Sequence, residues 1–306
     1  MKKRFNTILL MLLLVVFMLS ACQANTPVKS SQETIVVTYS ILGSVVKDLV
    51  GDKANVIVSM PNGQDPHEWE PSAKDIETLT KADLIIQNGL GLEGGMEKAL
   101  AQAKEAGVKF FTASDHITVR HVGEGEGIPS GDPDQAVGAE DPHLWTNPLL
   151  MKSIVDALAA QVKTDLGIDL TGQAKNLDAR LDSLDKEIVD IVNTLPENNR
   201  KLVTGHESMG YFAEHYGFKL VGAIIPSITS QAEVSASDLA QLKKLIADNQ
   251  VKAIFTELGT PAAVSDAIGK ETGVKVVVLT THSLPEDGSY FTFMRNLAKV
   301  IVDGLK

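Results

Sequence analysis

The chain of 306 residues carries 28 Lys and Arg against 39 Asp and Glu, a formal net charge of −11. This acidic balance attracts cations and argues against nucleic acid as a partner, because phosphates require a basic surface. The single cysteine excludes an internal disulfide and a zinc site built from several thiolates.

The N-terminus is typical of an exported protein. Three basic residues among the first four precede an apolar run at 8–19, which is shorter than the roughly 20 residues of a membrane-spanning helix and suits a signal peptide. A membrane-anchoring helix is the alternative. The sequence LSAC at 19–22 resembles the bacterial lipoprotein signal. We therefore predict a signal peptide at 1–21, a lipid on Cys22, a flexible tether at 22–33, and a protein anchored on the extracytoplasmic face of the cell membrane.

Strand and helix patterns alternate from residue 34 onward. Apolar β-branched runs predict buried strands, and the amphipathic segments between them predict helices. The expected elements are strands at 34–39, 55–60, 83–89 and 108–114 and helices at 41–52, after Ser72 and before the fourth strand. Such alternation predicts a parallel sheet of βαβ units, so we assign an N-terminal α/β lobe to 34–170. Within it, residues 121–143 are rich in Gly, Pro, Asp and Glu and are predicted to form a mobile acidic loop, neither sheet nor helix.

A long amphipathic helix is predicted at 171–196. Its apolar residues recur at spacings of four and three, which places them on one face, and Pro196 ends it. About 25 helical residues span about 37 Å, enough to run along two lobes as a stiff brace; an ordinary helix of one lobe is the alternative. The apolar stripe comprises Leu177, Leu181, Leu184, Ile188, Ile191 and Leu195.

A second set of strand patterns follows the long helix. Strands are expected at 201–205, 218–224, 251–257 and 274–280, with helical patterns between them, notably at 235–249. We assign a C-terminal α/β lobe to 197–306. The predicted fold class is therefore α/β, with two βα-type lobes, each with a parallel sheet, joined by a single long helix.

The pentapeptides DPHEW and DPHLW repeat one histidine-bearing turn and contain both tryptophans of the chain. His67 lies in the loop after the second expected strand, and His143 ends the acidic loop. His206 and His282 directly follow strands of the second lobe. Because ligands bind beyond the carboxyl ends of parallel strands, we expect two histidines from each lobe to meet, with the tryptophans packed beneath their loops. The alternative is that DPHxW is a turn leading into a helix, used twice for packing.

The other three histidines are weaker candidates. His215 is predicted to lie on a helix near the surface, and His116 and His121 flank the acidic loop. Histidine has many roles besides metal binding, so we expect His215 not to be a ligand, and His116 and His121 to bind metal loosely at most.

Four longer segments carry a family resemblance: DPHEWEPS at 65–72, DPHLWTNP at 141–148, GHESMGYF at 205–212 and SYFTFMRN at 289–296. With them, nearly the whole mature chain is similar to the solute-binding lipoproteins of zinc and manganese ABC importers, the ZnuA/TroA-like family. The resemblance implies one metal ion in the cleft between two α/β lobes. It also implies a monomer that delivers this ion to the permease of an ABC transporter.

The resemblance carries three ligand positions over to His67, His143 and His206. Histidine at the third position is typical of zinc-type members, whereas manganese-type members often have glutamate there. At the fourth position the family usually has aspartate, and this chain has His282 instead. Either His282 binds the metal or a carboxylate at 286–287 swings in; we favour His282, which needs no rearrangement.

Ligand chemistry favours zinc as the bound metal. Imidazole suits Zn²⁺, whereas Mn²⁺ prefers oxygen ligands and ranks below Zn²⁺ in affinity for nitrogen sites. Second-sphere carboxylates often hold the other ring nitrogen of a ligand histidine, and Glu207 and Glu257 are the candidates for this role. We expect Zn²⁺, with Mn²⁺ as the alternative.

Two further functions are weighed against a metal carrier. A zinc hydrolase needs an open metal position and a base, and the chain has no HExxH motif, so we expect no enzyme. An adhesin or interaction lipoprotein with a structural metal would require that metal for folding, whereas a carrier folds without it.

Overall fold

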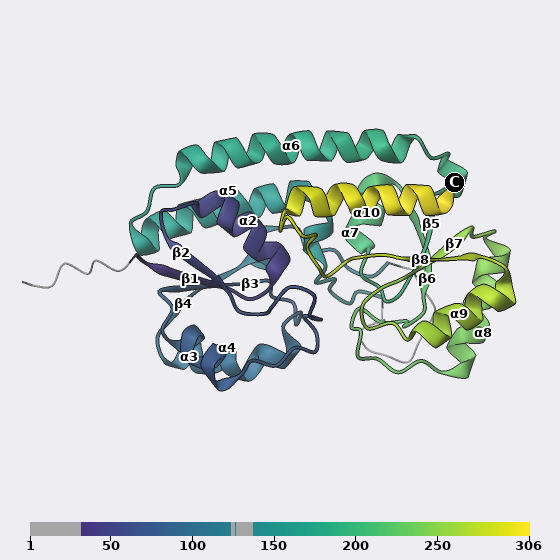
Figure 1. The fold of residues 1–306 in the computed structure, drawn as a ribbon, viewed down its shortest axis with the longest axis horizontal. Helices are drawn as coiled ribbons and strands as arrows, with labels where there is room; N and C mark the ends of the chain where they lie inside the picture. The colour runs from purple at the N-terminus through teal and green to yellow at the C-terminus, as the bar shows by residue number, and fades with distance from the viewer. Residues whose placement is uncertain (1–31, 124–125, 127–136) are drawn as a thin grey trace, which may run out of the picture. The chain divides into compact units, whose positions relative to one another are not determined.

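Two α/β lobes with parallel sheets lie beneath a long helix (Figure 1). The computed structural model describes residues 32–123, 126 and 137–306. The predicted signal peptide, Cys22, the tether up to residue 31 and twelve residues of the acidic loop (124–125 and 127–136) therefore lie outside the described residues. Within the described part of the chain, no helix has the length and apolar character needed to cross a membrane.

The N-terminal lobe is built on a four-stranded parallel sheet in the order β2-β1-β3-β4. All four strands were predicted, although each is shorter than its apolar run. Ser72 caps α3 in a reciprocal capping box with Asp75. The elements are β1 (Thr34–Val37), α2 (Ser40–Val50), β2 (Asn55–Val58), α3 (Ala73–Thr80), β3 (Leu84–Gln87), α4 (Glu97–Glu105), β4 (Lys109–Thr112) and α5 (Pro148–Leu166).

The acidic segment is not wholly irregular. His121 and Glu140 form an antiparallel bridge, and the Val122 and Ala139 backbones are hydrogen-bonded at 2.9 Å. The two ends of this segment are thus held together next to His143.

The C-terminal lobe contains the four predicted strands, arranged as two parallel pairs, β5-β6 and β7-β8. Strand β5 lies beside β7, so the two pairs are neighbours. Ser235 caps α8 with a second capping box. The elements are β5 (Lys201–Thr204), α7 (Gly210–Tyr216), β6 (Lys219–Ala223), α8 (Ala236–Asp248), β7 (Ala253–Thr256), α9 (Ala262–Thr272) and β8 (Lys275–Val278). Short 3₁₀ helices occupy Gly94–Met96, Ala113–His116, Leu144–Thr146 and Glu197–Asn199.

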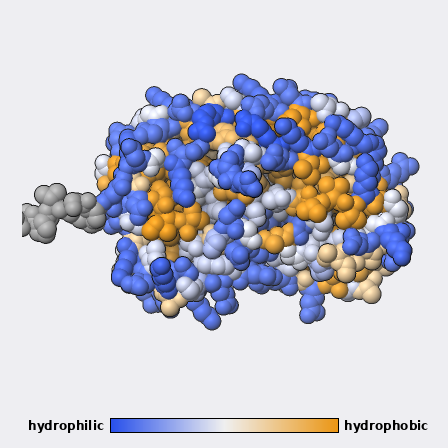
Figure 2. Space-filling view, viewed as in Figure 1, coloured by the Kyte–Doolittle hydropathy of each residue, from blue (hydrophilic) through white to orange (hydrophobic). Residues whose placement is uncertain are grey.

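The long helix α6 (Thr171–Asn193) packs along α5, α2 and the C-terminal helix α10 (Tyr290–Leu305). Its apolar stripe is buried as predicted up to Ile188, and Leu195, just beyond the end of the helix, is buried as well. In the last turn Val192 is buried and Ile191 only partly so, because Val192 follows Ile188 by four residues and stays on the same face. Polar side chains predominate along its outer edge (Figure 2).

Helix α10 makes a further connection between the lobes. The Tyr290 hydroxyl donates to the Trp145 carbonyl at 2.8 Å, and the Tyr290 backbone N–H donates to the Ser44 hydroxyl on α2 at 3.0 Å. The rest of α10 packs against α6, β7 and β8. The start of α10 is therefore held by the N-terminal lobe and its body by the C-terminal lobe.

Candidate metal site

The four predicted histidines converge at one point between the lobes. His67, His143, His206 and His282 each offer one ring nitrogen, and these atoms all lie within 4.8 Å of one another. All four residues are at most 5% exposed. His67 and His143 come from turns of the N-terminal lobe, and the other two follow β5 and β8. Two turns of the N-terminal lobe and two strand ends of the C-terminal lobe thus place four imidazoles in a closed cluster.

His143 lies at the centre of this cluster. Its Nε2 is 3.2 Å from the Nε2 of His67 and 3.2 Å from the Nε2 of His206. Its Nδ1 lies 2.9 Å from the Asp141 carboxylate and donates to it, so Nε2 carries the lone pair. Zn–N bonds of about 2.0–2.1 Å would separate tetrahedral ligand atoms by about 3.3–3.4 Å. The spacing therefore fits nitrogens that share one cation.

The two DPHxW motifs form the same local turn. The Asp65 carboxylate accepts the His67 backbone N–H at 3.0 Å, and Asp141 accepts that of His143 at 2.9 Å. Each is an Asx-turn, in which the aspartate binds the backbone two residues on. Both turns also lead toward helices, α3 and α5, so the packing role and the placement of a histidine coexist in one motif.

The two tryptophans are not equivalent. Trp145 is fully buried, with its ring 5.4 Å from that of His143 and 5.5 Å from that of His282 between centroids. Its Nε1 donates to the Thr281 carbonyl at 3.0 Å. Trp69 is partly exposed and packs against apolar residues of the N-terminal sheet. Only Trp145 contacts histidines from both lobes.

Glu257, one of the predicted supporting carboxylates, orients both histidines of the C-terminal lobe. Its Oε1 lies 3.4 Å from the Nδ1 of His206 and accepts the His206 backbone N–H at 3.1 Å. Its Oε2 accepts the Thr281 hydroxyl, which in turn lies 2.8 Å from the Nδ1 of His282. Because that hydroxyl donates to Glu257, it accepts from His282. Gly205 makes room for this contact, since a Cβ there would lie 2.4 Å from the Glu257 side chain.

The Nε2 atoms of His143, His206 and His282 face the cluster. The Nε2 of His282 is buried and has no hydrogen-bond partner among the described residues. Buried polar atoms are normally paired, so this nitrogen and the crowded Nε2 atoms of His143 and His206 indicate a ligand that accepts lone pairs. A divalent metal ion is such a ligand.

The pKa values follow from burial and these carboxylates. Burial, together with the neighbouring histidines, holds the pKa of His67 and of His282 well below 6.5. Burial also lowers the pKa of His143, although Asp141 opposes it. Burial would lower the pKa of His206, but the neighbouring Glu257 carboxylate outweighs burial and raises this pKa. Burial would raise the pKa of Glu257, yet His206 and the hydrogen bonds lower it to about 2, so Glu257 is ionised at neutral pH.

Other predicted residues are placed as follows. Glu207 is buried next to His206, and its charge contributes to raising the His206 pKa. Asp287 is exposed and accepts from the Ser289 backbone and the Thr292 hydroxyl at the start of α10. Glu286 is exposed as well. Neither of these two carboxylates belongs to the cluster.

The three weaker histidines lie outside the cluster too. His116 stacks on Phe111, His121 lies 3.9 Å from Glu140, and His215 pairs with Asp185 at 2.7 Å. Sequence reasoning missed Asp141 and Thr281 as residues that orient the rings. The repeated Asp two positions before each histidine was the available signal for Asp141.

The chain matches a known protein family over almost its whole length. The family model described as the periplasmic zinc-uptake complex component A matches residues 35–304. The manganese ABC transporter substrate-binding lipoprotein PsaA of Streptococcus pneumoniae is 30% identical over 320 residues, 99% of each chain. The manganese ABC transporter substrate-binding lipoprotein ScaA of Streptococcus gordonii is 30% identical over 315 residues, 97% of each chain.

A solved structure extends the comparison to the fold. The periplasmic zinc-binding protein TroA of Treponema pallidum superposes with a TM-score of 0.75 at 25% identity, over 90% of this chain and 99% of its own. With the family model covering both lobes, the chain belongs to the zinc-uptake complex component A family, the substrate-binding components of metal ABC transporters.

Proposed function

We propose that this protein captures Zn²⁺ outside the cytoplasm, on His67, His143, His206 and His282, and delivers it to the permease of an ABC importer. The observation that carries the proposal is the convergence of four buried ring nitrogens within 4.8 Å. The Asp141 carboxylate fixes which ring nitrogen of His143 faces the cluster, and the Glu257 carboxylate lies 3.4 Å from the Nδ1 of His206.

The donor set supports zinc over manganese. The cluster contains four imidazoles and no carboxylate among the described residues. Mn²⁺ prefers oxygen ligands, and nitrogen sites bind Zn²⁺ more tightly. Manganese is the alternative, because PsaA and ScaA, which cover this chain almost completely, are named as manganese proteins.

Charge compensation comes from behind the ligands. Four neutral imidazoles leave the +2 charge of the ion in place. Asp141 on His143 and Glu257 on His206 bring two negative charges into contact with the ligand rings. Such carboxylate–histidine–metal arrangements raise the basicity of the ligand nitrogen, which favours tight binding without a charged ligand.

A closed four-nitrogen shell supports transport rather than catalysis. A catalytic zinc keeps one position open for water or substrate, whereas four ligands here would fill a tetrahedron. The chain is proposed to act as a monomeric carrier and not as a hydrolase, and we propose no nucleic-acid partner.

Lipid attachment at Cys22 would hold the carrier on the extracytoplasmic face of the cell membrane, within reach of the permease. The test is fractionation of cells that express the full chain or its Cys22→Ala variant. The native chain is expected in the membrane fraction and the variant outside it. Equal membrane association of both would rule out anchoring through Cys22.

Transport itself is tested by growth under metal limitation. Cells that lack this gene are expected to grow poorly when zinc is chelated, and the full chain should restore growth. The His143→Ala chain should fail to restore it, whereas His215→Ala, a histidine outside the cluster, should succeed. Rescue of the deletion strain by added Mn²⁺ and not by Zn²⁺ would assign the alternative metal.

A further inference from the structure

The loop that carries His67 makes polar contacts across the cleft at two separate points. Asn62 lies just after the end of the N-terminal strand β2, yet its side chain binds the backbone of Leu284 in the other lobe. Its Nδ2 donates to the Leu284 carbonyl at 2.9 Å, and its Oδ1 accepts the Leu284 N–H at 2.7 Å. The Ser40 hydroxyl also donates to this Oδ1, at 3.1 Å. One amide side chain thus pairs with both polar groups of one residue on the segment that follows His282.

The second point lies at the His67 turn. The Gln231 side-chain amide donates to the His67 carbonyl at 3.0 Å, and the Ser230 hydroxyl donates to the Asp65 carboxylate at 2.7 Å. Ser230 and Gln231 belong to the loop between β6 and α8 of the C-terminal lobe. The turn that presents the His67 ring is therefore held from the opposite lobe.

We infer that Asn62, Ser230 and Gln231, hereafter the clasp, keep the lobes closed over the metal and set how fast it is released. None of the three is a metal ligand in the cluster. They act through the residues they hold: the backbone beside His67 and the segment beside His282. This inference rests on the proposed function and adds the step that controls release.

Burial of the site explains why such a device is needed. The four histidines are at most 5% exposed, so an ion leaves only after the lobes separate. Separation breaks the hydrogen bonds of the clasp, while α6 and α10 still connect the lobes. Hydrogen bonds that exist only in the closed form slow opening and leave capture by the open form unaffected.

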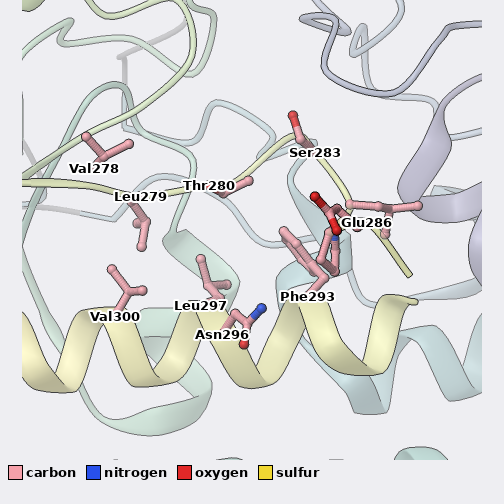
Figure 3. A pocket seen from close by; sticks show the side chains of 11 residues that line it. Val278, Leu279, Thr280, Ser283, Glu286, Phe293, Asn296, Leu297 and Val300 are labelled. Carbon is pink, nitrogen blue, oxygen red and sulfur yellow. The ribbon is translucent and has the colours of Figure 1, made fainter. Parts of the chain in front are cut away.

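The segment around Leu284, which Asn62 binds in the C-terminal lobe, has room to move. A cavity of about 310 Å³ separates the segment around Leu284 from α10, with Phe293 and Leu297 on its α10 wall (Figure 3). Since proteins are otherwise close-packed, this segment is less constrained on that side than a packed strand would be. Loss of the Asn62 contacts therefore frees the segment to withdraw together with His282.

The test compares release and closure in the full chain carrying Cys22→Ser, whose sequence then has no native cysteine. Zinc release into excess chelator is followed by stopped flow for the native residues and for Asn62→Ala/Gln231→Ala. Asn62→Ala removes the hydrogen bonds to the Leu284 backbone, and Gln231→Ala removes the hydrogen bond to the His67 carbonyl. Each bond is worth roughly a three- to tenfold change in rate. The double variant loses three hydrogen bonds between the lobes, so we expect it to release zinc roughly 30- to 1000-fold faster, with uptake at least as fast as in the parent.

Closure is measured separately, without metal. Spin labels on Lys104→Cys in α4 and Lys270→Cys in α9 report the distance between the lobes. The metal-free clasp variant should show longer distances than the metal-free parent, at the same melting temperature. The matched control is Asn198→Ala/Gln241→Ala, which removes one exposed amide of each kind away from the cleft and should match the parent.

The outcomes separate this inference from the proposed function. Faster release together with longer label distances supports the clasp. Unchanged release and unchanged distances in the clasp variant overturn it, even if the parent binds zinc tightly. If the parent binds no zinc, the proposed function fails, and the label distances alone decide for or against the clasp.

Discussion

One carboxylate oxygen of Asp141 lies 2.9 Å from both the backbone nitrogen and the ring Nδ1 of His143. It thus fixes the turn and the tautomer of the central histidine at once. Arg120 binds the second oxygen at 3.3 Å and holds the carboxylate in place. The twin motif has no such arrangement, because the second oxygen of Asp65 binds Ser230 instead.

Asp141→Asn should weaken zinc binding by about 10- to 100-fold, the usual cost of losing an outer-sphere partner of a metal ligand. The amide can still accept the backbone N–H, so the turn is retained, but the negative charge behind the ring is lost. Calorimetric titration with Zn²⁺ measures the effect. Asp185→Asn is the control, since Asp185 also pairs with a histidine, His215, away from the cluster. Equal affinities of the two variants would show that the Asp141 charge does not act on the metal.

Replacement of a single cluster histidine should cost more than loss of its supporting carboxylate. His67→Ala, His143→Ala and His206→Ala are each expected to reduce zinc affinity by at least about 100-fold, because each removes a ligand atom and leaves a gap in the shell. His215→Ala should bind zinc like the native protein. Native affinity in any of the first three variants would remove that residue from the proposed ligand set.

The pH dependence of binding should begin with His206. A ligand imidazole must be neutral, so protonation competes with the metal. The His206 pKa lies above 6.5 and those of His67, His143 and His282 lie below it. As the pH falls, His206 therefore takes up a proton first, at a pH above 6.5, and zinc affinity begins to decline there. The decline steepens at lower pH as the other three follow.

Proton release on zinc binding measures this order directly. Calorimetry in buffers of different ionisation enthalpy should show more protons released per zinc near pH 6.5 than at pH 8.5. A flat affinity profile down to pH 5 would be incompatible with a site made of histidines.

Removal of the metal should leave the protein folded. The cores of both lobes are formed by fully buried apolar side chains that do not depend on the cluster. We expect cooperative thermal unfolding of the chelator-treated protein and a rise in melting temperature when zinc is added, because a ligand that binds only the native state stabilises it. An unfolded metal-free protein would instead indicate a structural metal.

Much of the fold could be predicted from the sequence, because it follows local patterns. Apolar β-branched runs predicted all eight strands found among the described residues, and the period of Leu177 to Ile188 predicted the face that α6 buries. The strand ends were placed less well, since an apolar run such as 34–39 continues past the strand to Tyr39, which is buried against Trp145. Pairing of the C-terminal strands as two separate ladders also lies beyond local pattern.

His206 and His282 were predicted from topology, because residues that follow parallel strands gather at one edge. His67 and His143 were predicted from the repeated DPHxW motif. What holds them was predicted only in part. Glu257 was named, but its path through Thr281 to His282 depends on two segments 24 residues apart. The clasp likewise joins Asn62 to a backbone 222 residues away. Neither contact leaves a spacing or a periodicity in the sequence.

The central claim is that four imidazoles bind the metal. It depends on whether the fourth ligand is His282 or a carboxylate at 286–287. Chelator-stripped protein would be titrated with Zn²⁺ and Mn²⁺ in competition, beside His282→Ala and Asp287→Asn. A site of four imidazoles predicts tight zinc, weak manganese, a loss of zinc affinity in His282→Ala and native affinity in Asp287→Asn. Manganese bound as tightly as zinc, or native affinity in His282→Ala with a loss in Asp287→Asn, would contradict it and assign the fourth ligand to a carboxylate.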